Sequence, residues 1–159
     1  MKLSRLAIIA VAAISTACNS DESTGPSPII DARLAAVATV TSSSVMINNV
    51  QTVGMRVDVT SALSEPVTGS SCARLVEARA PGGSTWVDVT AATGVCSANI
   101  LRLVPGSTAQ LLAIADQAKL RALITGVNRS VTIRVQHTLD GVNANYTLQS
   151  NDVAFTVPS

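Results

Sequence analysis

The chain has few aromatic side chains: its 159 residues include one tryptophan, one tyrosine and one phenylalanine. Surfaces that stack single-stranded nucleic acid or sugars need several exposed rings, and three aromatic residues are too few for either. Lysine and arginine are scattered one at a time along the sequence, whereas phosphate binding requires them in clusters. Both scarcities argue against nucleic acid as a partner.

The sequence also lacks the patterns that carry catalysis. It contains a single histidine, His137, no Gly-x-Ser-x-Gly elbow and no Cys-x-x-Cys pair. Its carboxylates form no Asp-x-Asp-x-Asp-Gly cluster of the kind that binds hard cations. We therefore predict a non-enzymatic protein without catalytic residues, cofactor or metal site, in which His137 is half-buried near the end of a strand. A hydrolase that uses His137 as its base stays open as a third interpretation.

A long apolar run is missing as well. The apolar residues 6–14 would span about 14 Å as a helix, under half of a roughly 30 Å hydrocarbon core. Lys2 and Arg5 precede this run, and Ser15-Thr16-Ala17-Cys18 follows it. A positive start, a short apolar stretch and small residues before a cleavage point are typical of a secretory signal.

The end of this signal resembles the lipobox of bacterial lipoproteins, with Ser15 in the place of the usual larger aliphatic residue. The resemblance implies that residues 1–17 are cleaved and that Cys18 is diacylated as the new N-terminus. In many such lipoproteins an aspartate after the cysteine causes retention in the inner membrane, so Asn19 favours the outer membrane. The alternative is a plain secreted protein with an additional cysteine near its start.

The residues after Cys18 read NSDESTGPSP and include no large apolar side chain. Such a segment cannot bury enough surface to offset its ordering entropy, so residues 18–28 are predicted to form a flexible tether with a reach of about 18 Å. Residues 29–159 are then one domain. Loss of Lys2 and Arg5 with the signal leaves nine of the 11 basic side chains beside ten acidic ones, which is close to neutral.

The remaining two cysteines are expected to pair. With Cys18 used by the lipid, Cys72 and Cys96 are left for each other, and export places them in an oxidising compartment. A bridge between them would close a loop of about 25 residues and contribute about 3 kcal/mol on the chain-entropy model. We predict a structural disulfide.

The domain reads as strands. Residues 131–139 (VTIRVQHTL) alternate apolar and polar side chains with period two, which places one row on a core and the other in water. A hairpin turn at Asp140-Gly141 should lead to a partner strand at 144–148. Further strands are expected at these ranges: 34–41, 45–47, 53–59, 72–79, 84–90, 100–104, 109–115 and 153–157. Helix formers near 117–123 indicate one short helical crossover.

The order of the cysteines, turns and strands along the chain also resembles a known pattern. A cysteine strand is followed by a Gly-Gly turn, Trp86-Val87-Asp88-Val89, a second cysteine, Leu-Val-Pro-Gly-Ser at 103–107 and a terminal Phe155-Thr156-Val157. This pattern resembles small bacterial lipoproteins with an immunoglobulin-like sandwich, loosely similar to the intracellular proteinase inhibitor type. The fold class we predict is all-β, an immunoglobulin-like antiparallel β-sandwich of about seven to nine strands. Trp86 and Phe155 are expected in its core.

The leading functional hypothesis is a lipid-anchored module of the cell envelope that mediates protein interaction or surface assembly. An exposed edge strand can add a partner's strand through backbone hydrogen bonds, and 153–157 is one candidate. A proteinase inhibitor or another secreted binding protein is the alternative, with the loops around Gly82-Gly83 or at 91–94 as reactive segments. A homo-oligomer also stays open.

Overall fold

The computed structural model describes residues 29–92 and 99–158. The predicted signal at 1–17, the tether at 18–28, the lipidation site Cys18 and the predicted disulfide partner Cys96 lie outside the described residues. No helix in the described part of the chain is long and apolar enough to span a membrane.

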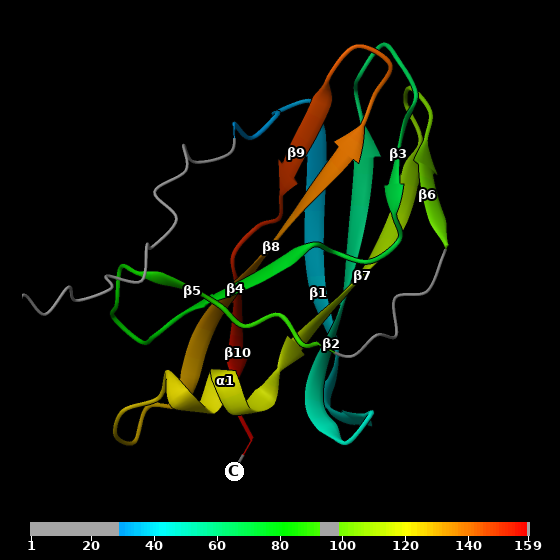
Figure 1. The fold of residues 1–159 in the computed structure, drawn as a ribbon. Helices are drawn as coiled ribbons and strands as arrows, with labels where there is room; N and C mark the ends of the chain where they lie inside the picture. Colours follow the sequence, from blue (N-terminus) through cyan, green and yellow to red (C-terminus); the bar gives the residue numbers. More distant parts are fainter. Residues whose placement is uncertain (1–28, 93–98, 159) are drawn as a thin grey trace, which may run out of the picture.

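Ten strands and one short helix make up the described chain (Figure 1). Their bounds are β1 Leu34–Ile47, β2 Val50–Ser61, β3 Val67–Ser70, β4 Leu75–Arg79, β5 Trp86–Asp88, β6 Ile100–Leu103, β7 Thr108–Asp116, α1 Gln117–Ala122, β8 Ser130–Asp140, β9 Asn145–Gln149 and β10 Val153–Thr156. The all-β prediction is confirmed. The strand count is one above the predicted seven to nine. The predicted ranges 34–41 and 45–47 are one strand, β1, and β3 was missed because it is only four residues long and contains Gly69.

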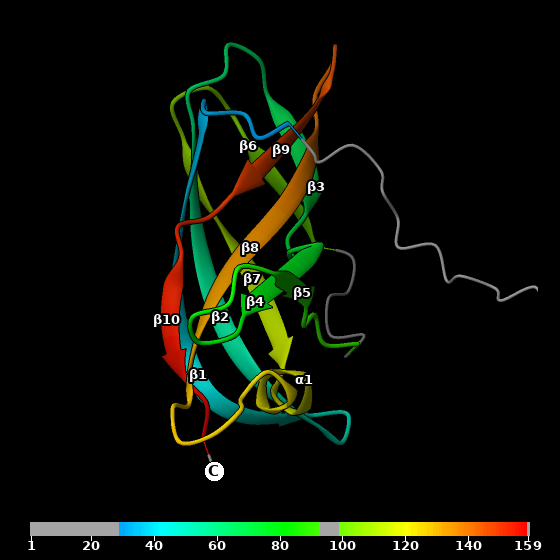
Figure 2. The ribbon, with the colours of Figure 1, turned by 90° about the vertical axis from the view of Figure 1, so that its left-hand side faces the viewer.

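The strands form two antiparallel sheets. The smaller has the order β1-β2-β7, and the larger has the order β5-β4-β8-β3-β6, with β9 and β10 also paired to β8. Figure 2 shows β8 running along the larger sheet, with β9 and β10 following one another beside it. The predicted hairpin of 131–139 with 144–148 and the pairing of 72–79 with 84–90 are confirmed as β8–β9 and β4–β5.

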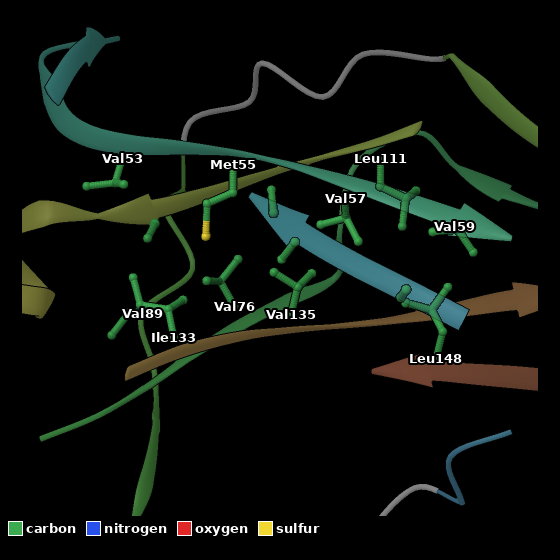
Figure 3. Packing of buried hydrophobic residues seen from close by; sticks show 14 of the residues in the cluster. Val53, Met55, Val57, Val59, Val76, Val89, Leu111, Ile133, Val135 and Leu148 are labelled. Carbon is green, nitrogen blue, oxygen red and sulfur yellow. The ribbon is translucent and has the colours of Figure 1, made fainter. Parts of the chain in front are cut away.

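The core lies between the two sheets and follows from the period-two pattern. On β8, Val131, Ile133, Val135 and Leu139 are at most 1% exposed, and the alternate row on the outer face is half-buried: Thr132, Arg134, Gln136 and Thr138. Alternate valines of β2 and Met55 face them from the smaller sheet (Figure 3). Removal of this apolar surface from water is the main stabilising term. Phe155 is 6% exposed and belongs to the core, as predicted.

Hydrogen bonds join the two sheets along both sides of the sandwich. On one side the Asn151 N–H donates to the Ala36 carbonyl at 3.3 Å, and the Asn151 Oδ1 accepts from the Ala38 N–H at 2.8 Å. On the other side the Leu112 N–H donates to the Ser71 carbonyl at 2.9 Å, and the Asp116 N–H donates to the Val89 carbonyl at 2.7 Å. Parts of the sheet edges are therefore already covered by the chain itself.

The region with helix formers divides as predicted, into the strand β7 and the helix α1. Asp116 ends the strand and caps the helix, because its Oδ1 accepts hydrogen bonds from the Ala118 N–H at 2.8 Å and the Lys119 N–H at 3.4 Å. Leu120 is fully buried and fixes the helix against the end of the sandwich.

Two neighbouring leucines of β7 test the core assignment. Leu111 is 1% exposed and Leu112 is 40% exposed. We expect Leu111→Ala to lower the free energy of unfolding by about 2–5 kcal/mol because it leaves a cavity. Leu112→Ala, the matched control, should change it by about 0.5 kcal/mol or less. Urea unfolding of both variants measures the difference, and equal losses would contradict the assignment.

Candidate functional site

The only tryptophan of the chain lies on the outer face of the larger sheet. The prediction that Trp86 packs in the core is wrong, since the ring is half-buried at the solvent side. The reason is register: Trp86 pairs with Arg79, and the residue before it on β4, Ala78, is the one that points into the core. Cross-strand partners share a face, so Trp86 points outward with Arg79.

Two arginines lie over this ring. The Arg134 guanidinium carbon lies 3.9 Å from the ring centroid of Trp86, and that of Arg79 lies 4.9 Å from it. Both distances are within the range of cation–π attraction. The Arg134 Nε also donates to the Glu77 Oε2 at 2.7 Å, and the Gln136 Nε2 donates to the same oxygen at 3.0 Å. We call Glu77, Arg79, Trp86, Arg134 and Gln136 the Trp86 cluster.

The Trp86 cluster is preformed in the free protein. Arg134 and Glu77 are both mostly buried, at 19% and 16% side-chain exposure, so their ion pair is partly shielded from solvent. Arg79 makes a further contact with Asp152 at 3.6 Å. Such a cluster offers a fixed aromatic ring, guanidinium donors and a carboxylate. These groups suit recognition of another surface.

His137 is more deeply buried than predicted. It is 4% exposed and lies on the core-facing row of β8. Its Nδ1 accepts a hydrogen bond from the Arg74 N–H at 3.2 Å. Burial lowers the pKa of His137 below its ordinary value of 6.5, and the Arg74 charge adds to this, while the Ser70 carbonyl and Asp140 oppose it. Within the described residues no serine or carboxylate side chain is hydrogen-bonded to the ring, so the arrangement of a serine hydrolase is not assembled there.

The start of the described chain is fixed beside β9. The Asp31 N–H donates to the Thr147 carbonyl at 2.8 Å, and the Arg33 guanidinium carbon lies 5.5 Å from the ring centroid of Tyr146. The Tyr146 hydroxyl in turn donates to the Glu65 carboxylate. The salt bridge to Arg33 lowers the pKa of Asp31 to about 2. These contacts determine where the predicted tether joins the domain.

The remaining predicted sites fall into two groups. Cys72 is buried, but Cys96 lies outside the described residues, so their pairing stays a prediction. The candidate inhibitor loop at Gly82-Gly83 forms an exposed turn, in which Gly82 has φ +70° and the Gly83 N–H donates to the Ala80 carbonyl at 3.0 Å. Of the second candidate loop, only Ala91 and Ala92 are described. In the described part of the chain, no three His, Cys, Asp or Glu side chains gather as metal ligands would.

No protein-family model and no curated protein sequence matches this chain. Among solved structures, a Northeast Structural Genomics Consortium target aligns with 7% identity and a TM-score of 0.49, over 82% of this chain and 91% of that one. The putative ApaA protein from Bordetella pertussis aligns with 14% identity and a TM-score of 0.44, over 82% of this chain and 98% of that one. Neither likeness says what this chain binds.

The burial of His137 makes the stability of the folded chain depend on pH. The folded-state pKa of His137 lies below 6.5, so the unfolded chain takes up a proton that the folded chain resists. Stability is therefore complete above about pH 6.5 and is lost as the pH falls through the folded-state pKa. Urea unfolding between about pH 7 and about pH 5 should show a decline in wild type that His137→Gln reduces. An equal decline in both proteins would mean that His137 is not the cause.

Proposed function

We propose that this chain is a non-enzymatic, lipid-anchored module of the cell envelope that binds a protein partner through the Trp86 cluster. The observation that supports this proposal is the position of Trp86, which the fold places at the solvent side with two arginines. Tryptophan and arginine are the residues most enriched among those that dominate binding energy at protein interfaces. The chain has a single tryptophan, and the core does not use it.

The fixed geometry of the cluster favours binding. An arginine that is free in solution loses conformational freedom when a partner orders it, and this loss weakens association. Arg134 is already held in place, because its Nε donates to Glu77 and its guanidinium carbon lies over the Trp86 ring. A partner that carries a carboxylate or an apolar side chain could contact the cluster without reordering it.

The proposed anchor is compatible with access to this surface. The lipid on Cys18 would hold the chain to the membrane, and the tether would join the domain where Asp31 contacts β9. Trp86 lies on β5, at the other side of β8 from β9. A tether with a reach of about 18 Å leaves the outer face of β4, β5 and β8 free to meet a protein. The proposed delivery to the outer membrane is supported only by Asn19, which stands after Cys18 where an aspartate would favour the inner membrane.

Two alternative functions are each supported by one specific feature of the structure. The strand β10 pairs with β8 through four residues, and a partner strand could add at its other edge, as proposed for 153–157 from the sequence. A proteinase inhibitor would use the exposed Gly82-Gly83 turn. Unchanged rates of a protease panel in the presence of the protein would discard the inhibitor.

Site-specific photocrosslinking in intact cells tests the interaction. Ala154 is exposed and pairs with Thr132, which in turn pairs with Arg79, so it lies in the same cross-strand row as Trp86. A photoreactive phenylalanine at Ala154 should give a protein adduct that Trp86→Ala removes. Gln110, exposed on the smaller sheet, is the matched control position and should give none. No adduct from Ala154, or the same adduct from both positions, would overturn the proposal.

A further inference from the structure

The strand β5 forms one edge of the larger sheet, beside the Trp86 cluster. It pairs with β4 on one side, and within the described chain no strand pairs with its other side. Figure 1 shows β5 at the opposite end of this sheet from β6. Val87 is 41% exposed, and Asp88 is exposed as well. An open strand edge therefore lies next to the tryptophan that we propose for binding.

The register shows that two residues of β5 direct their backbone groups to the open edge. The Val89 N–H donates to the Val76 carbonyl at 2.8 Å. Hydrogen-bonded and non-hydrogen-bonded pairs alternate along an antiparallel ladder, so the next position that bonds to β4 is Val87. The N–H and C=O groups of Trp86 and Asp88 then point away from β4. Among the described residues these four groups have no hydrogen-bond partner.

Asp88 adds an uncompensated negative charge to this edge. It lies opposite Glu77, in the closer, non-hydrogen-bonded kind of pair, and like charges directly opposite each other are destabilising. Glu77 is compensated by the Arg134 Nε at 2.7 Å. Asp88 forms no ion pair in the part of the chain that the structure describes, and its Oδ1 accepts from the Thr90 N–H at 2.8 Å. A cation supplied from outside would offset the repulsion between the two carboxylates.

We propose that the protein partner of the Trp86 cluster adds an extended strand to the open edge of β5, an inference that rests on the proposed function. The backbone of the added strand bonds to the four outward groups of Trp86 and Asp88. A lysine or arginine of that strand lies against Asp88. Because side chains alternate with period two, the residue two positions along lies beside the Trp86 ring, and it is apolar or aromatic. The partner segment therefore carries one basic and one apolar residue on the same face.

Amide hydrogen exchange of the full chain, measured by NMR, tests whether the edge of β5 is open. The Val87 N–H bonds to β4, whereas the N–H groups of Trp86 and Asp88 point to solvent. We expect the amides of Trp86 and Asp88 to exchange about tenfold faster than that of Val87, or faster still. Protection of either amide equal to that of Val87 would mean that the edge is already occupied, and would overturn the proposal.

The photocrosslinked adduct from Ala154 tests the charge contact. Asp88→Asn keeps an oxygen for the Thr90 N–H and removes only the charge, so the yield of adduct should fall about tenfold. Asp58→Asn, the same change on the smaller sheet, is the matched control and should leave the yield unchanged. An undiminished yield from Asp88→Asn would show that no basic residue lies against Asp88, and would overturn the proposal.

A proline at the same position tests the backbone bonds. Proline is tolerated at edge positions whose N–H faces solvent, so Asp88→Pro should keep the native far-UV circular dichroism. It removes an outward N–H as well as the charge, and the yield of adduct should fall about fivefold below that of Asp88→Asn. Equal yields from the two variants would mean that the partner does not bond to the β5 backbone, which would overturn strand addition.

The same experiment separates this inference from the proposed function. An adduct from Ala154 that Trp86→Ala removes, and that neither variant at Asp88 diminishes, would leave the protein partner in place and overturn strand addition alone. Absence of any adduct from Ala154 would overturn both.

Discussion

The alternation along β8 is the constraint on which the rest of the structure depends. This strand pairs with β3, β4, β9 and β10, so its register sets the position of every strand of the larger sheet except β5 and β6, which pair through β4 and β3. One row of its side chains, with Val131 and Ile133, closes the core. The other row carries Arg134 to Glu77 and Trp86. A shift of one residue would exchange the two rows, and would place a guanidinium in the core.

Most of the fold could be predicted because it follows from local patterns. Period-two alternation identified β8 and the valine-rich part of β2, and helix formers after a strand identified α1. The ranges 34–41 and 45–47, which read as two weak strands, are one strand, β1, with register shifts between Val40 and Val45. Irregular pairing of this kind depends on the partner strand, and the sequence of β1 alone does not contain it.

The candidate sites were harder to predict because they depend on contacts between distant strands. Arg134 and Glu77 are 57 residues apart in sequence, and only the register of β4 on β8 brings them to the same ring. Trp86 was expected in the core because it is hydrophobic, but its pairing with Arg79 on the outer face of β4 points it outward. The burial of His137 was underestimated for the opposite reason: its place in the apolar row of β8 outweighed its polarity. Strict application of the period-two pattern to β8 would have predicted the burial of His137.

An anchored binding module requires both a lipid on Cys18 and a domain held intact outside the cytoplasm. The most direct measurement is the intact mass of the protein extracted from membranes without reductant. The account predicts the mass of residues 18–159 with acyl chains added and two hydrogens missing, the latter from a Cys72–Cys96 bridge. A lipid-free mass that starts at another residue would contradict the anchor, and would make the chain a soluble secreted protein.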